Sequence, residues 1–199
     1  MTAPFALVLA AGGSRRFGSP KVLADLKGRT LIELAVERVR AVVGEEFAVV
    51  VGAHADDLLS VTNLAPAQII RREDWNLGHA ASLRDGVTRT PDAARGVLIT
   101  LVDQPLVTVD DVHRLVSAWE KAPTWAAAAE YAGDDGTALI GAPCVLPRAW
   151  FASVKALRGD RGASTLLRSS SQVLRVPMPS AAHDIDTPED LERLSILEG

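Results

Sequence analysis

The sequence predicts an α/β fold in which a mostly parallel, twisted sheet is flanked by helices. Short apolar runs bounded by glycine or turn residues indicate buried strands. Amphipathic segments that open with helix-start signals follow these runs. Because strands and helices alternate in this way over the first 120 of the 199 residues, we expect a Rossmann-like sheet with helices on both faces.

The first strand and the first helix carry clear local signals. Residues 5–10 are apolar on both faces, as in a buried parallel strand. Thr30-Leu-Ile-Glu33 has the capping-box pattern of a helix start. The same reasoning places strands at 47–51, around 69–70 and at 96–102, and helices at 55–62, 80–88 and 108–119.

The second part of the chain is less regular. The expected elements are strands at 125–131, 138–146 and 173–176 and helices at 147–157, at 163–167 and after Thr187. Gly141 and Pro143 are expected to break the second of these strands. Because there is no repeat, low-complexity tract or linker, we expect one domain over residues 1–199, with a nucleotide-binding half at 1–120 and a more variable half at 121–199.

Composition narrows the class of protein. A formal net charge of -4 argues against nucleic acid as the main partner, because phosphate backbones select clusters of Lys and Arg. The single cysteine, Cys144, cannot form an internal disulfide, which favours a reducing compartment. The apolar run at 5–11 is too short to span a membrane and lacks the basic flank of a secretion signal. We expect a soluble, cytoplasmic protein with no membrane partner.

The segment LVLAAGGSRRFGSPK, residues 7–21, is a candidate phosphate-binding loop that fits neither common template. The Walker pattern fails because Ser19 stands where lysine is required. The dinucleotide-binding pattern fails because Ser14 stands where its second glycine is required.

The physical features of a phosphate loop are nevertheless present. Gly12 and Gly13 allow backbone N–H groups to approach an anion, and Arg15, Arg16 and Lys21 add positive charge. The loop also leaves the carboxyl end of a buried strand, where open α/β sheets bind ligands. The alternative is a glycine turn with solvated basic side chains.

Asp103 and Asp186 are candidate metal ligands, with Asp184 nearby. Asp103 directly follows the strand at 96–102, so its carboxylate should lie beside the glycine loop. Asp184 and Asp186 point to one side of an extended segment. Carboxylates at this edge suit Mg²⁺, which uses one or two of them together with substrate phosphates. The alternative for Asp103, Asp184 and Asp186 is stabilisation of a helix start.

Five segments in order resemble the nucleotidyltransferases that join a nucleoside monophosphate to sugars, alcohols and cofactors. They are LAAGGSRRFGSPK, GHAASLRDGV at 78–87, LVDQPLVT at 101–108, ALRGDRGASTLL at 156–167 and DIDTPEDLERL at 184–194. The chain is most similar to the molybdenum cofactor cytidylyltransferase branch of this superfamily. The resemblance implies a glycosyltransferase-A-like fold, like that of the nucleotide-diphospho-sugar transferases, and a Mg²⁺-dependent transfer of CMP from CTP to the phosphate of molybdopterin.

The resemblance also assigns roles to residues. It implies that Asp103 and Asp186 hold the metal and that Arg16 and Lys21 hold the triphosphate. It also implies that Ser82 contacts the base, and the alternative is that Ser82 is an ordinary serine at a helix start. The nucleotide-binding residues that it implies are Leu9, Ala10, Ala11, Gly12, Gly13, Arg16, Lys21, Ser82 and Asp103. The methyl group of Ala11 favours CTP, because guanylyl relatives carry a second glycine there that leaves room for a purine.

The acceptor side departs from the family pattern. Cytidylyl members usually show glycine-histidine-proline where this chain has Gly141-Ala142-Pro143. Asp160 and Arg161 in GDRGA, with Asp184, are the candidate acceptor-binding residues of the half at 121–199, although the first two could simply pair in a turn. A molybdoenzyme or its insertion chaperone is the further partner that the resemblance implies.

Other classes of protein remain as alternatives. They are a nucleotidyltransferase with another nucleotide or acceptor, a nucleotide-dependent oxidoreductase on a similar fold, and a non-catalytic cofactor-binding or insertion partner. The missing dinucleotide pattern argues against the second, and the full set of triphosphate and metal residues argues against the third. The histidines show no metal-ligand spacing, so we do not expect zinc. Trp75 is expected to pack in the core, with the cleft as its alternative place.

Overall fold

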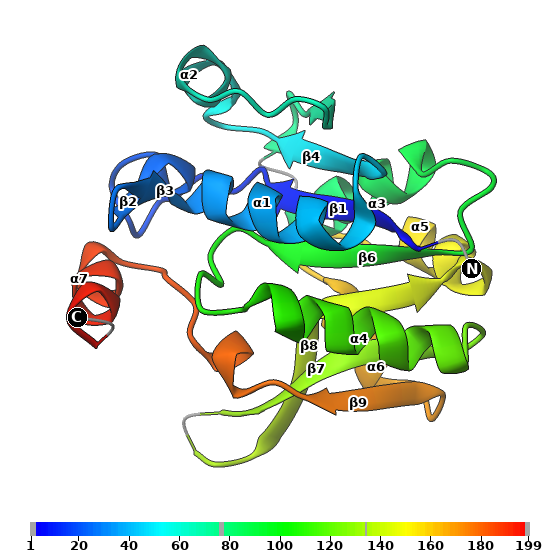
Figure 1. The fold of residues 1–199 in the computed structure, drawn as a ribbon. Helices are drawn as coiled ribbons and strands as arrows, with labels where there is room; N and C mark the ends of the chain where they lie inside the picture. The colour runs from blue at the N-terminus through cyan, green and yellow to red at the C-terminus, as the bar shows by residue number, and fades with distance from the viewer. Residues whose placement is uncertain (1–2, 76–77, 134, 198–199) are drawn as a thin grey trace.

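The computed structural model describes residues 3–75, 78–133 and 135–197, and in these ranges a seven-stranded sheet runs through both parts of the chain (Figure 1). The strand order is β5-β4-β1-β6-β8-β7-β9. The strands are β1 (Phe5–Ala10), β4 (Phe47–Val51), β5 (Gln68–Arg71), β6 (Gly96–Leu101), β7 (Ala126–Ala132), β8 (Ala138–Pro147) and β9 (Val173–Pro177). The predicted α/β fold with a mostly parallel sheet is confirmed.

The direction of the strands changes in the second part of the chain. β5, β4, β1 and β6 are parallel, whereas β8 is antiparallel to β6 and to β7. The expected break in β8 takes the form of a bulge: the strand is one continuous element, but its register with β7 shifts there. Ala142 and Pro143 bulge out between Gly141 and Cys144, which pair with adjacent residues of β7. A bulge tolerates proline because the missing N–H is not required there.

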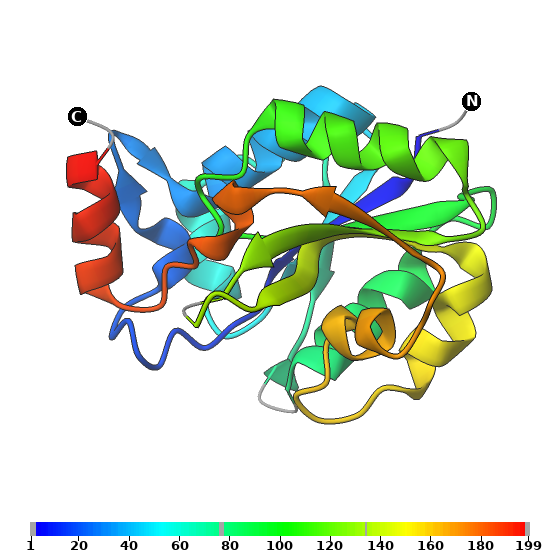
Figure 2. The same cartoon turned by 90° about the horizontal axis from the view of Figure 1, so that it is seen from below.

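Helices cover both faces of the sheet (Figure 2). One face carries α1 (Leu31–Val43) and α4 (Val109–Lys121), and the other carries α3 (His79–Arg89), α5 (Phe151–Ala156) and α6 (Ala163–Arg168). Beyond these two layers lie α2 (Ala55–Val61), α7 (Pro188–Leu197) and the small ribbon of β2 (Asp25–Leu26) and β3 (Arg29–Thr30). The helix expected at 147–157 is a 3-10 turn at Arg148–Trp150 followed by α5. No helix in the described ranges has the length and apolar character needed to cross a membrane.

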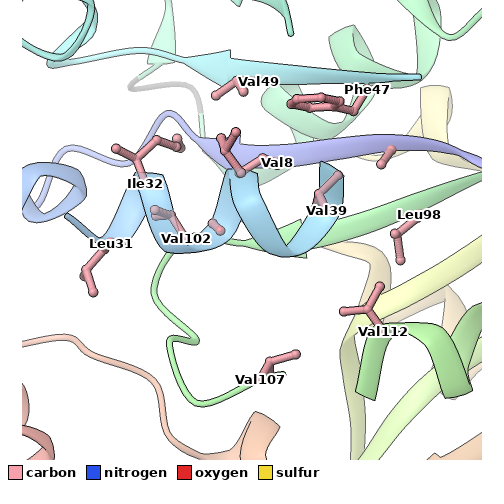
Figure 3. Close-up of a cluster of buried hydrophobic side chains, with 14 of the residues drawn as sticks. Val8, Leu31, Ile32, Val39, Phe47, Val49, Leu98, Val102, Val107 and Val112 are labelled. Carbon is pink, nitrogen blue, oxygen red and sulfur yellow. The ribbon is translucent and has the colours of Figure 1, made fainter. Parts of the chain in front are cut away.

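Successive side chains of the central strands point to opposite faces of the sheet, and they contribute to two apolar clusters, one on each face. Val8 of β1 and Leu98 of β6 pack with Ile32 and Val39 of α1 and with Val112 of α4 (Figure 3). Burial of these apolar side chains is the main favourable term for such a layered fold. This packing holds the carboxyl ends of β1 and β6 beside one another.

A buried arginine shapes the segment that follows β6. Arg38 of α1 is 5% exposed, and its Nη1 donates hydrogen bonds to the carbonyls of Gln104 (2.8 Å) and Val107 (2.5 Å). Burial lowers the pKa of Arg38 to about 10, with Asp111 opposing this shift, so the guanidinium remains charged at neutral pH. The Gln104 amide donates in turn to the carbonyls of Ala142 and Ala181. Residues 104–107 are therefore held by three separate parts of the fold.

We expect Arg38→Met to lower the free energy of unfolding by about 3 kcal/mol, because two buried carbonyls lose their charged donor. Urea unfolding measures this change. Arg40→Met is the matched control, since Arg40 is exposed on the same helix and should change stability by less than about 0.5 kcal/mol. Equal effects of the two substitutions would contradict the role given to Arg38.

Candidate functional site

The loop between β1 and residue 21 is folded by contacts of its own. The carbonyl of Ser14 accepts hydrogen bonds from the N–H groups of Phe17 (3.0 Å) and Gly18 (3.1 Å), and the hydroxyl of Ser14 accepts one from the N–H of Lys21 (3.0 Å). Phe17 is buried and anchors the loop in the core. The loop therefore has a fixed shape, with the side chains of Arg15 and Arg16 outside it.

The ammonium group of Lys21 is the centre of the site. It lies 2.8 Å from Oδ2 of Asp103, 2.7 Å from the carbonyl oxygen of Ile185 and 3.4 Å from Oδ1 of Asp186. The Lys21 side chain is only 13% exposed. One cation thus joins the glycine loop, the carboxyl end of β6 and the segment before α7.

Asp186 faces the site and not the following helix. Its Oδ2 lies 2.9 Å from Nη2 of Arg16. The start of α7 is stabilised instead by Thr187 and Asp190, whose side chains bond each other's backbone N–H groups. Likewise the start of α4 is capped by Thr108 and Asp111, so Asp103 has no capping role there. The helix-start alternatives for Asp103 and Asp186 do not describe the geometry.

The carboxylates of Asp103 and Asp186 fit a divalent cation. Both have an oxygen within 3.4 Å of the same ammonium group, so one cation can reach both. Oδ1 of Asp103 is buried and has no hydrogen-bond partner. Within the described ranges no group of three or more His, Cys, Asp or Glu side chains could hold a metal. Two carboxylates suit Mg²⁺, which takes its remaining ligands from water and phosphate.

Asp184 lies on the flank of this cluster. Burial and the nearby charges of Asp103 and Asp186 together raise the pKa of the Asp184 carboxyl to about 6, against the opposing effects of Gln104 and Lys21. Asp184 thus adds a third carboxyl group beside those of Asp103 and Asp186. The positive charges of Arg16 and Lys21 offset their mutual repulsion.

A cavity of about 360 Å³ opens above this cluster. It is lined by Leu9, Ala11, Gly12, Gly13, Ser14, Arg15, Arg16, Lys21, Val22, His79, Ser82, Leu101, Val102, Asp103 and Asp186. A second cavity of about 270 Å³ is lined by Ala11, Gly12, Gly13, Ser14, Arg15, Trp75, Gly78, His79, Ser82 and Asp160. Since the two share the glycine loop, His79 and Ser82, they form one elongated site with two different ends.

Trp75 forms part of the wall of this site. A Cβ added at Gly13 would lie 2.6 Å from Cζ3 of Trp75, and one at Gly52 would lie 2.7 Å from Cβ of Trp75. Glycine at these two positions lets the indole lie directly against the loop. The expectation that Trp75 packs in the core is wrong, because the side chain is half-buried and lines the second cavity.

The structure brings most of the predicted site residues together. Those that line the elongated site are Leu9, Ala11, Gly12, Gly13, Arg16, Lys21, Ser82, Asp103, Asp160 and Asp186. Ala10 is buried in the core, and neither Arg161 nor Asp184 lines the two cavities. Sequence reasoning did not assign Ser14, Val22, Gly78, His79, Leu101 or Val102 to the site. Ser14 carries a detectable signal, a short hydroxyl side chain inside a tight loop, and Val22 carries none.

The fold and the site define a nucleotidyltransferase of the glycosyltransferase-A-like fold. More specifically, the chain belongs to the MobA-like NTP transferase domain family, whose model matches residues 6–174.

Relatives of the chain carry several names. It is 32% identical to nicotine blue oxidoreductase of Paenarthrobacter nicotinovorans over 94% of each chain, and 31% identical to the purine catabolism protein PucB of Bacillus subtilis over 92% of each. Among solved structures, Rv0371c of Mycobacterium tuberculosis superposes with a TM-score of 0.86 at 27% identity, covering 98% of this chain and 99% of that one. Rv0371c has also been solved in complex with manganese, and that structure has a TM-score of 0.81 at 25% identity over the same shares of the two chains.

We expect Gly13→Ala to displace the Trp75 indole and to lower the free energy of unfolding by about 1–3 kcal/mol through overpacking. Tryptophan fluorescence and urea unfolding measure the two effects. Gly12→Ala is the control, because a Cβ at Gly12 has no atom within 4 Å. The loss caused by Gly13→Ala should disappear in a Trp75→Ala background, and a loss that persists there would contradict the contact as its cause.

Proposed function

We propose that this protein transfers CMP from CTP to the phosphate of molybdopterin and releases pyrophosphate. The observation that carries the proposal is the cluster of Lys21, Asp103 and Asp186 beside the glycine loop. Such a cluster supplies positive charge and a metal site where a triphosphate would lie, and the reaction requires both. Membership of a nucleotide-transferring family supports the reaction class.

The reaction is a single displacement at phosphorus. An oxygen of the acceptor phosphate forms a bond to the α-phosphorus of CTP while the bond from this phosphorus to the oxygen bridging the β-phosphate breaks, and the pair of electrons leaves with pyrophosphate. Arg16, Lys21 and the backbone N–H groups of Gly12 and Gly13 hold the triphosphate and offset its charge. No side chain needs to act as a nucleophile.

Asp103 and Asp186 would hold Mg²⁺ against the triphosphate. When bound, the ion supplies a positive charge that polarises the phosphoryl oxygens and stabilises the leaving pyrophosphate. Lys21 now bridges the same two carboxylates, so its ammonium group is placed to exchange contacts between them and the phosphates. The manganese complex of Rv0371c supports the binding of a divalent ion by a protein of this fold.

The choice of CTP rests on the wall of the site next to the base. Ala11 is 6% exposed and lines both cavities. Its methyl group occupies space beside the base that guanylyl enzymes leave open by carrying glycine at this position. Ser82 lines the same region from the first turn of α3. These two side chains support a pyrimidine as the base.

The proposal that molybdopterin is the acceptor rests on the sequence motifs. Arg161 and Asp184 lie outside the two cavities of the nucleotide, on segments that border it. Ala142 replaces the usual histidine and lies in the bulge of β8, where its carbonyl accepts a hydrogen bond from Gln104. A phosphorylated small molecule other than molybdopterin is the nearest variant of the proposal.

A nucleotide-dependent oxidoreductase is the second candidate, and the name of the relative from Paenarthrobacter nicotinovorans favours it. A reductase would bind NADPH or a flavin in the elongated site. A spectral change on titration with either compound, without pyrophosphate release from any nucleoside triphosphate, would favour this candidate.

We expect CTP at one hundred times its dissociation constant to raise the melting temperature by about 5–10 °C, with Mg²⁺ required for the full effect. Asp103→Asn should remove the Mg²⁺-dependent part and slow pyrophosphate release by about a hundredfold or more. Asp110→Asn, at an exposed position outside both cavities, is the control. The triphosphate site is refuted if no nucleoside triphosphate shifts the melting temperature.

We expect Ala11→Gly to increase the affinity for GTP relative to CTP by about tenfold, because removal of one methyl group makes room for the larger base. Competition between the two nucleotides in a binding assay measures the ratio. An unchanged ratio would show that Ala11 does not select the base.

A further inference from the structure

The two ends of the elongated site differ in chemistry. One end carries Arg16, Lys21 and the metal-site carboxylates, and the other carries Trp75, Gly78 and Asp160. A nucleoside triphosphate also has two different ends, one strongly anionic and one flat and uncharged. Since the phosphates belong with Lys21 and the metal, the base lies toward Trp75 and Asp160.

Asp160 is held at the base end by the packing of its loop. The N–H of Ala80, in the first turn of α3, donates a hydrogen bond to the carbonyl of Gly159 (3.0 Å). Gly78 has a φ of 91°, and a Cβ there would lie 2.6 Å from the Gly159 carbonyl oxygen and 2.6 Å from Oδ1 of Asp160. The loop therefore lies directly against the start of α3, and the carboxylate faces the same cavity as Ser82 and Ala11.

The charge of Asp160 determines what it can bind. No hydrogen bond or ion pair joins its carboxylate to the rest of the described chain, including the adjacent Arg161. A carboxylate repels phosphate, so it does not suit the triphosphate or an anionic acceptor. It accepts hydrogen bonds from neutral N–H groups, and a cytosine base presents such a donor in its exocyclic amine.

We propose that Asp160 accepts a hydrogen bond from the exocyclic amine of cytosine and so selects CTP over UTP. This inference rests on the proposed function, and it gives Asp160 a place at the nucleotide in contrast to the acceptor role that the motif resemblance implied. Uracil presents a carbonyl oxygen where cytosine presents its amine, and this oxygen faces a carboxylate unfavourably. Ala11 excludes the larger bases, and Asp160 distinguishes between the two pyrimidines.

The test is a set of dissociation constants measured by calorimetry with Mg²⁺ for CTP, UTP and inorganic tripolyphosphate. The wild-type protein should bind CTP at least about tenfold more tightly than UTP, as expected for loss of one charge-assisted hydrogen bond. In Asp160→Asn the amide can donate to uracil as well as accept from cytosine, so the ratio should fall close to one. Tripolyphosphate should bind both proteins equally, and Asp110→Asn should keep the wild-type ratio.

Each other outcome overturns the inference in a distinguishable way. An unchanged ratio in Asp160→Asn shows that the carboxylate does not contact the base edge. An equal loss for CTP and UTP shows a contact with the ribose or a role in loop shape. Failure of the wild-type protein to bind CTP refutes the proposed function itself, whereas tight CTP binding without preference over UTP refutes only the role of Asp160.

Discussion

The site depends on one largely buried ammonium group, that of Lys21. Lys21 contacts acceptors from two parts of the chain far from it in sequence, namely Asp103 after β6 and residues 185 and 186 before α7. Without a cation, carboxylates this close together would repel one another by several kcal/mol at the edge of a protein. Lys21 therefore keeps the carboxylates in position, and it does so next to the glycine loop.

The sheet makes this arrangement possible. β1 and β6 are parallel neighbours, so the glycine loop and Asp103 leave the same edge of the sheet. The N–H of Ile185 donates to the carbonyl of Asp103 (2.8 Å), which fixes the last segment across this edge. Arg38 and Gln104 hold the chain just beyond Asp103 from the other side. The carboxylate of Asp103 is thus positioned by backbone contacts and not by its own side-chain bonds alone.

Local patterns in the sequence predict the features that depend on local chemistry. The apolar run of β1, the capping box at Thr30 and the position of Asp103 at a strand end can all be found from residue order. The sequence indicates an irregularity at Gly141 and Pro143 but not its form, because the bulge reflects pairing with β7 and contacts with Gln104. The position of Trp75 could not be predicted either. It depends on close contacts with Gly13 and Gly52, which are distant in sequence and come together with Trp75 only when the loop and β4 are packed.

The contact between Lys21 and residues 185 and 186 also has a consequence for synthesis on the ribosome. The glycine loop and Asp103 emerge early, and the parallel strands around them can pair before the rest of the chain exists. Asp186 and the Ile185 carbonyl emerge only after β7, β8 and β9. A nascent chain that has made its whole parallel sheet still lacks one carboxylate and the backbone acceptor that orient Lys21. The cluster around Lys21 is therefore completed in one late step, when the segment before α7 packs across the edge of an otherwise finished sheet.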